Sequence, residues 1–79
     1  MIFRGIVING MFKGCVRVYV DGTLISVIKH IDNGNIFMPF NVKFKKETKI
    51  TTCDKNIDIT IIPDRGMKIK RIRNTFVLS

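Results

Sequence analysis

The sequence predicts an all-β fold, a small antiparallel β-sandwich of about seven strands, with a small β-barrel as the alternative. Apolar residues recur at every second position in segment after segment, and no stretch shows the three-and-four spacing of an amphipathic helix. Turn-forming pairs such as Asn9-Gly10 and Asp21-Gly22 interrupt this alternation roughly every eight to twelve residues. The chain has 79 residues, which suffice for one domain, and we expect it to span residues 1–79.

The first half predicts an opening strand and a hairpin. A strand over residues 2–8 ends at Asn9-Gly10, a pair that tolerates positive φ in a tight turn. The hairpin is predicted around Asp21-Gly22, because the valines of residues 16–20 fall on one face of the strand that precedes it. The strand that follows should stop in the turn-forming residues 32–35.

The next segments are predicted to alternate between a buried face and a wet face. Residues 36–40 include Pro39, which cannot donate to a ladder, so an edge strand or a crossing between sheets is predicted there. Val42 and Phe44 should point inward, with a turn at residues 46–48 and a further strand from Ile50.

The end of the chain predicts one more buried strand and an irregular last segment. The isoleucines at 57, 59 and 61 define a strongly buried face after a polar turn at residues 54–56. In residues 67–78 the apolar side chains change parity, and a bulge near Lys70-Arg71 would restore the phase.

One ordered set of residues resembles the carboxypeptidase regulatory-like, transthyretin-like group of small Ig-like β-sandwiches. The set comprises Arg4 to Val7, Asn9-Gly10, Gly14, Cys15 to Gly22 and Asp32 to Phe37, within a likeness that covers residues 4–61. After Phe37 the chain departs from the pattern, since Lys46, Glu47 and Thr48 replace its Gly and Tyr. The resemblance implies a module without catalytic residues, which acts as a spacer, an adhesion unit or a decoration in cell-surface and virion proteins.

The titratable residues do not predict an enzyme, a metal site or a cofactor. The single histidine, His30, has no Ser or Cys in its sequence context to act as a nucleophile with it. Asp54, Asn56 and Asp58 have the spacing of a calcium loop, but Ile59 and Arg65 stand where Gly and Glu are required. No zinc cluster, Walker-type loop or dinucleotide fingerprint is present in the sequence.

The cysteines and the opening residues predict a compartment. A disulfide between Cys15 and Cys53 is geometrically allowed but not indicated, so we expect two free thiols. Polar residues and glycines interrupt residues 1–10, so no export signal is predicted. No apolar run approaches the roughly 18 residues of a membrane span, so we expect a protein made in the cytoplasm and no membrane partner.

Charge and exposed apolar residues predict two contact surfaces. Lys and Arg total 14 against six acidic residues, a net charge of +8 that favours an anionic partner. The predicted basic contact face consists of Lys43, Lys45, Lys46, Lys49, Lys68, Lys70, Arg71 and Arg73. Alternatively, these cations only keep strand edges from pairing with other chains. The predicted protein interface consists of Ile36, Phe37, Met38, Phe40 and Tyr19, although Tyr19 could instead belong to a second inner face.

These observations favour a non-enzymatic module that binds a protein partner with an acidic or apolar surface. An accessory or decoration subunit of a larger assembly, such as a phage virion, is the setting that the resemblance alone implies. The alternative is a small basic β-barrel that binds nucleic acid through phosphate contacts. Few aromatic residues and no Trp are present for base stacking, which favours the protein partner. A viral inhibitor of a host nucleic-acid enzyme would use the same interface.

Overall fold

The structure is a computed structural model that describes residues 1–9, 12–31, 35–53 and 58–79. Within these ranges the chain forms eight β-strands and no helix, which confirms the all-β prediction with one strand more than expected. The strands are β1 (Ile2–Asn9), β2 (Phe12–Val20), β3 (Thr23–Ile31), β4 (Asn35–Lys43), β5 (Thr48–Thr52), β6 (Asp58–Ile62), β7 (Ile69–Ile72) and β8 (Thr75–Leu78). The predicted turns at residues 10, 32–34 and 54–56, and most of the calcium-like spacing, lie outside the described residues.

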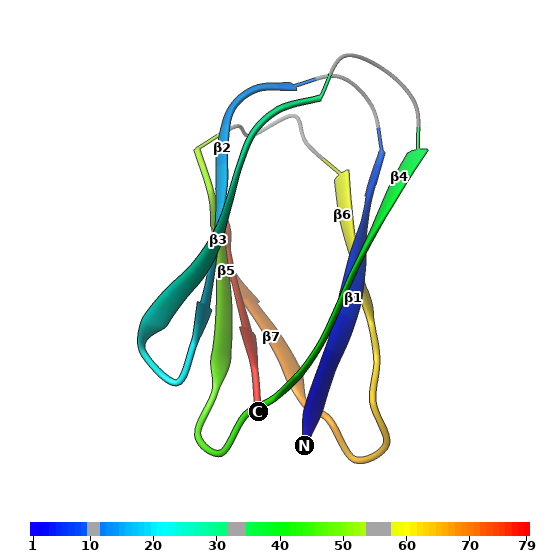
Figure 1. The fold of residues 1–79 in the computed structure, drawn as a ribbon, viewed down its shortest axis with the longest axis vertical. Helices are drawn as coiled ribbons and strands as arrows, with labels where there is room; N and C mark the ends of the chain where they lie inside the picture. Colours follow the sequence, from blue (N-terminus) through cyan, green and yellow to red (C-terminus); the bar gives the residue numbers. More distant parts are fainter. Residues whose placement is uncertain (10–11, 32–34, 54–57) are drawn as a thin grey trace.

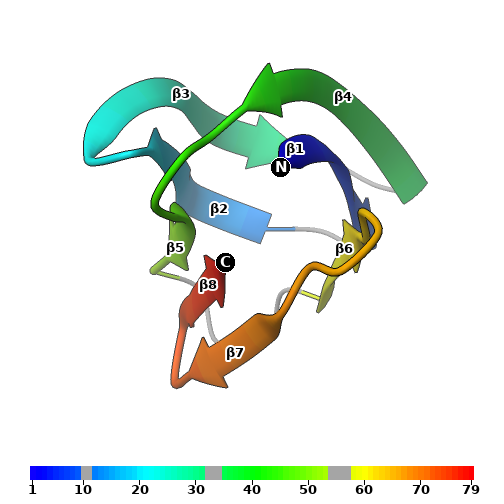
Figure 2. The ribbon, with the colours of Figure 1, turned by 90° about the horizontal axis from the view of Figure 1, so that it is seen from below.

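The strands form two antiparallel sheets that face each other. One sheet has the order β4-β1-β6 and the other has the order β3-β2-β5-β8-β7 (Figure 1). Seen along the strands, the two sheets curve around a shared interior (Figure 2). No ladder joins the described strands of one sheet to those of the other, so the sandwich is confirmed and the closed barrel is wrong.

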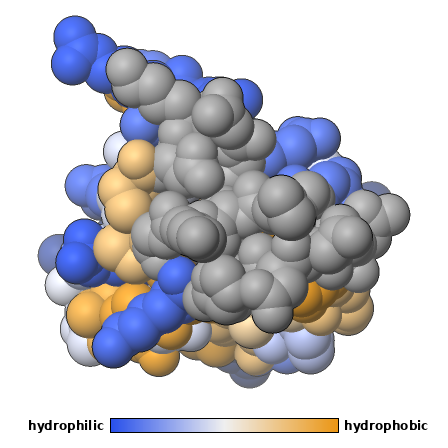
Figure 3. All heavy atoms as spheres, turned by 90° about the horizontal axis from the view of Figure 1, so that it is seen from above, coloured by the Kyte–Doolittle hydropathy of each residue, from blue (hydrophilic) through white to orange (hydrophobic). Residues whose placement is uncertain are grey.

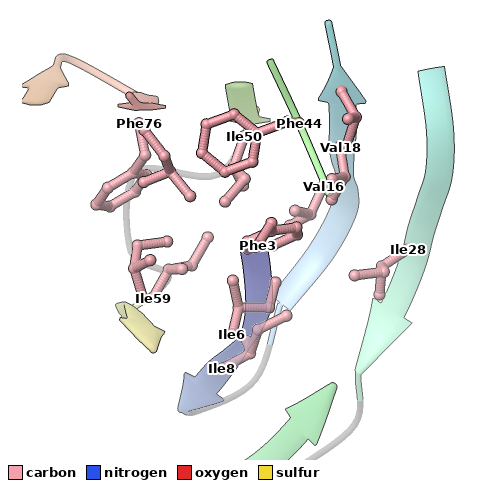
Figure 4. Packing of buried hydrophobic residues seen from close by; sticks show 13 residues of the cluster. Phe3, Ile6, Ile8, Val16, Val18, Ile28, Phe44, Ile50, Ile59 and Phe76 are labelled. Atoms are coloured by element: carbon pink, nitrogen blue, oxygen red, sulfur yellow. The ribbon is translucent and has the colours of Figure 1, made fainter. Parts of the chain in front are cut away.

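The core lies between the two sheets and consists of the side chains that alternate inward. Figure 4 shows these residues converging from both sheets. Ile6 and Ile8 of β1 stand opposite Ile61 and Ile59 of β6 in the smaller sheet. The buried cluster comprises Phe3, Ile6, Ile8, Val16, Val18, Val20, Ile28, Phe44, Ile50, Ile59, Ile61, Phe76 and Leu78. Each large side chain that is fully buried contributes about 1.5–3 kcal/mol to folding.

The hairpin between β2 and β3 has the turn that the sequence predicts. Asp21 and Gly22 both have positive φ, 49° and 85°, and they separate the paired residues Val20 and Thr23. Two successive residues with positive φ are typical of a type I′ turn, which matches the right-handed twist of the flanking strands.

The last two strands correct the expectation of a bulge near Lys70-Arg71. A two-residue turn at Arg73 and Asn74 separates β7 from β8, and Ile72 pairs with Thr75 across it. Arg73 adopts a φ of 54° at this turn. The parity change in the sequence therefore marks a hairpin, and the isoleucines of β7 are exposed instead of sharing the core with Phe76.

The proline-containing segment is an edge strand, one of its two predicted positions. β4 lies at the edge of the smaller sheet, and Pro39 stands opposite Gly5 next to an irregularity in the β1–β4 register. The strand continues to Lys43, and Phe44 beyond it is buried as expected. The predicted turn at residues 46–48 ends one residue earlier, because β5 begins at Thr48.

Asp64 fastens the start of β1 to the loop after β6. Its carboxylate accepts a hydrogen bond from the Ile2 backbone N–H at 2.9 Å and pairs with the Arg4 guanidinium at 3.2 Å. Hydrogen bonds from backbone N–H groups lower the pKa of Asp64 below its ordinary value, because they stabilise the ionised carboxylate. The hydrogen bond from Ile2 has the largest effect.

Candidate functional site

The outward side of the five-stranded sheet, called the outer face below, carries two rows of side chains that cross all five strands. The strand registers bring these residues together although they come from five separate segments. One row contains Val27, Arg17, Thr51, Thr75 and Ile72, and the next contains Leu24, Tyr19, Lys49, Val77 and Lys70. They point outward because their neighbours along each central strand, such as Val18, Ile50 and Phe76, are buried in the core.

Aliphatic side chains make up much of the outer face. Leu24 is 46% exposed, Val27 is 40% exposed and Ile72 is 53% exposed. They lie on the two edge strands of the sheet, and half-buried Val77 lies between them on β8. Hydrophobic residues also reach the surface at the rim of the upper end of the sandwich, beside strongly hydrophilic ones (Figure 3). An exposed apolar surface of this kind, mixed with cations, is typical of a contact site.

The charged members of the outer face are all cations. Arg17, Lys49 and Lys70 belong to the two rows, and Lys49 and Lys70 both stand opposite Val77. Their strands are two strand spacings apart, about 10 Å. The acidic side chain that reaches Lys49 is Glu47, at 4.0 Å in an exposed pair, which contributes little in water. The outer face therefore presents an aliphatic surface with positive charge distributed across it.

Tyr19 lies near the lower end of this face, at the edge of a shallow hollow. The hollow has a volume of about 180 Å³ and is lined by Tyr19, Gly22, Glu47 and Lys49. This volume is below the roughly 300–1,000 Å³ of small-molecule sites, so the hollow fits a side chain of a partner better than a free ligand.

Asp21 holds the basic loop between β4 and β5 beside the outer face. Its carboxylate accepts hydrogen bonds from the backbone N–H groups of Lys45, Lys46 and Glu47 at 2.9, 2.7 and 3.1 Å. The bonds from Lys45 and Lys46 lower the pKa of Asp21 below its ordinary value, against a smaller opposing effect of desolvation. The backbone of this lysine pair is thereby fixed, while both side chains remain exposed.

The structure divides the eight residues of the predicted basic face among several places. Lys49 and Lys70 share the outer face, whereas Lys45 and Lys46 lie in the loop that Asp21 holds. Lys43 ends β4 in the other sheet, and Lys68 exchanges two backbone hydrogen bonds with Ser79. Arg73 forms the last turn.

Arg71 packs against the edge of the core instead of joining the outer face. Its guanidinium carbon lies 5.0 Å from the centre of the Phe76 ring, and its Nε donates to the Arg73 carbonyl at 3.2 Å. These contacts place Arg71 on the same side of the sheet as buried Phe76, opposite which it stands in the register.

The predicted apolar interface is divided as well. Ile36, Met38 and Phe40 are half-buried against the core, and the Phe40 ring stacks on Phe3 with centroids 4.9 Å apart. Phe37, 57% exposed, lies on the outward side of the smaller sheet, opposite Val7. Tyr19 lies outward on the other sheet, so the alternative of a second inner face for it is wrong. Phe37 and Tyr19 therefore face away from each other on opposite sides of the sandwich.

Leu24, Val27 and Ile72 were not among the site residues predicted from the sequence. The sequence does indicate such a surface where apolar residues occupy both odd and even positions of one strand, as Leu24, Ile25, Val27 and Ile28 do in β3. A strand with a single wet face shows apolar residues at one parity only, so an excess at both indicates a second contact surface.

The described part of the chain contains no group of three or more His, Cys, Asp or Glu residues that could hold a metal ion. The same residues contain no helix that is long and hydrophobic enough to span a membrane. Comparisons of the chain with protein-family models, with curated proteins and with solved structures found no match.

Proposed function

We propose that this protein is a non-enzymatic binding module whose outer face docks on an acidic surface of a partner protein. The observation that supports the proposal is the combination of exposed Leu24, Val27 and Ile72 with Arg17, Lys49 and Lys70 on one sheet face. Exposed apolar residues mark protein contact surfaces, and complementary charge selects the partner and speeds the encounter.

The composition of the outer face favours a different, acidic protein as the partner over a second copy of this chain. Two copies that met through this face would bring Arg17, Lys49 and Lys70 of each against the same cations of the other, at a cost of repulsion. A partner surface on which carboxylates lie between apolar side chains would instead satisfy both features of the face.

Nucleic-acid binding is the second candidate, supported by one arrangement on the same face. Tyr19 stands opposite Lys49 and shares its strand with Arg17, so a base could stack on the ring while the cations contact phosphates. The other residues of the two rows offer no ring for a second base, which is why we favour the protein partner.

The biological setting that we propose follows the family resemblance. An accessory or decoration subunit of a larger assembly such as a virion, made in the cytoplasm, has to attach to a protein surface without catalysing a reaction. A rigid sheet face with aliphatic and cationic side chains is suited to that task.

Peptide selection followed by binding measurements tests the docking proposal. Random peptides displayed on a carrier should yield ligands for the immobilised protein that combine Asp or Glu with apolar residues. A synthetic peptide from this selection should lose about tenfold or more in affinity on Lys70→Glu, which places a like charge in the contact. Arg65→Glu is the matched control, because it changes the net charge equally but lies in the exposed loop between β6 and β7.

Equal losses in the two variants would contradict the proposal, because they would show attraction to the net charge alone. A mobility-shift assay with mixed-sequence single-stranded DNA separates the second candidate. Tight binding at about 50 mM salt that weakens steeply with added salt, together with no acidic peptide ligand, would replace the protein partner by nucleic acid.

A further inference from the structure

Cys15 and Cys53 lie directly opposite each other on the outward side of the five-stranded sheet. They extend the β2–β5 register by one pair beyond Val16 and Thr52, and their Sγ atoms are 3.5 Å apart. Both thiols are free, with Cys15 half-buried and Cys53 exposed.

The backbone already holds the two cysteines at the separation that a disulfide requires. The Cys53 N–H donates to the Cys15 carbonyl at 3.4 Å, and the Cys15 N–H donates to Cys53 Sγ at 3.1 Å. Opposite residues of antiparallel strands have Cα atoms about 4.5–5.5 Å apart, within the roughly 4.4–6.8 Å that disulfides span. For the bond to form, the two Sγ atoms have to approach from 3.5 Å to about 2.05 Å.

The surroundings make the two thiols unequal in reactivity. Hydrogen bonds from Cys15 lower the pKa of Cys53, with the backbone N–H having a larger effect than the thiol. The hydrogen bond to Cys53 raises the pKa of Cys15. The thiolate is the reactive form of cysteine, so the exposed Cys53 is the sulfur that attacks first.

We propose that Cys15 and Cys53 form a redox-active pair that closes to an intramolecular disulfide by exchange with a small-molecule disulfide such as oxidised glutathione. The Cys53 thiolate attacks one glutathione sulfur, which breaks the glutathione S–S bond and releases one glutathione thiolate. The Cys15 thiol then loses its proton to water and attacks Cys53 Sγ, which expels the second glutathione as a thiolate; both released thiolates take up a proton from water. The protein dithiol is oxidised, and one glutathione disulfide is reduced to two glutathione molecules.

The disulfide would join β2 to the central strand β5 at a point outside the core. It does not depend on the docking function: the cysteines lie on the outer face next to Arg17 and Thr51, but the exchange uses no side chain of the two rows. The pair therefore represents a separate modification site, in which the exchange chemistry requires only the protein and a small disulfide.

Thiol trapping and intact-mass measurement test this proposal. The reduced protein is incubated with oxidised glutathione, quenched with acid, and treated with a maleimide. The wild type should lose both free thiols, retain no glutathione, remain monomeric on a non-reducing gel, and decrease in mass by two hydrogens. Cys15→Ser should retain one glutathione on Cys53, because the second attack is absent. Cys53→Ser should react more slowly than Cys15→Ser, because Cys15 is the less acidic and the less exposed thiol.

Three results would overturn the proposal. The first is a wild type that retains glutathione or forms disulfide-linked dimers, which would show that the two thiols do not reach each other. The second is a wild type with two free thiols under conditions in which Cys15→Ser takes up glutathione. The third is Cys15→Ser that takes up none, which would show that Cys53 is not the attacking thiol.

Discussion

Replacing Gly5 by Ala tests how closely the backbone of β4 approaches its paired strand β1 at this position. A Cβ at Gly5 would lie 2.5 Å from the Met38 carbonyl oxygen and 3.2 Å from the Pro39 Cα, so the β4 backbone would have to move by about 0.9 Å to reach an ordinary contact of 3.4 Å. Overpacking of this kind costs about 1–3 kcal/mol, while the loss of glycine freedom in the unfolded chain returns about 0.4–1 kcal/mol. The expected net loss is about 1–2 kcal/mol, out of roughly 4–12 kcal/mol for a chain of this length.

Urea denaturation and thermal melting measure this loss, and the melting temperature should fall by roughly 5–15 °C. The double variant with Phe37→Ala is the informative control, because the Phe37 ring carbon at 3.0 Å can move aside whereas the Met38 carbonyl belongs to the backbone. Most of the loss should therefore remain in the double variant. An unchanged or increased stability of Gly5→Ala would refute the close approach of the Met38 carbonyl to Gly5.

Five further variants test the core, one turn and the pH response. Ile50→Ala should cost about 2–5 kcal/mol by leaving a cavity in the core, whereas Ile72→Ala on the exposed surface should cost less than about 1 kcal/mol, and similar losses in urea melts would contradict the assigned faces. Thr48→Val should be neutral or stabilising by about 1 kcal/mol, because the buried Thr48 hydroxyl has no hydrogen-bond partner among the described residues; a clear loss of stability would reveal such a partner. Arg73→Gly should stabilise by up to about 1 kcal/mol by relieving the positive φ, and destabilisation would show that the arginine side chain matters more than the turn. Because the pKa of Asp64 is lower in the folded protein than in the unfolded chain, its carboxylate stabilises the fold fully above about pH 4, its pKa in the unfolded chain. This stabilisation is lost as the pH falls through the pKa in the folded protein, so the free energy of unfolding of Asp64→Asn should change less with pH below pH 4. An unchanged profile in that variant would contradict this role.

The fold could be predicted to the level of its class, its first hairpin and its buried faces. Period-two hydrophobicity fixes which side of a strand is buried, so Val16, Val18 and Val20 were assigned correctly from their spacing alone. The turn at Asp21-Gly22 was predictable because few residue pairs tolerate two positive φ angles.

The turn between β7 and β8 escaped prediction for the same physical reason. Arg73 adopts the left-handed conformation without being Gly, Asn or Asp, so Asn74 is the one turn-forming residue of this pair, too weak a signal to predict a turn. The change of parity indicated that a continuous strand was impossible, but a bulge and a hairpin produce the same change in a single sequence.

The candidate site was less predictable, because it depends on which strands are neighbours. Lys49 and Lys70 share a face only because β8 lies between β5 and β7, and no local pattern specifies this order. Cys15 and Cys53 likewise meet because β2 pairs with β5, a contact between residues 38 positions apart. The resemblance to transthyretin-like sandwiches remains a prediction.

The two ends of the chain lie at the same end of the sandwich (Figure 1), and backbone hydrogen bonds fix both of them. The Met1 carbonyl accepts from Phe44 N–H at 2.9 Å, and Ser79 exchanges hydrogen bonds with Lys68 at 2.7 and 2.9 Å. A short glycine-serine linker should therefore join the ends, and the chain could be reopened at an exposed turn such as Arg73-Asn74. Such a circular permutant would move the attachment point of a label or fusion partner without changing any side chain of the outer face.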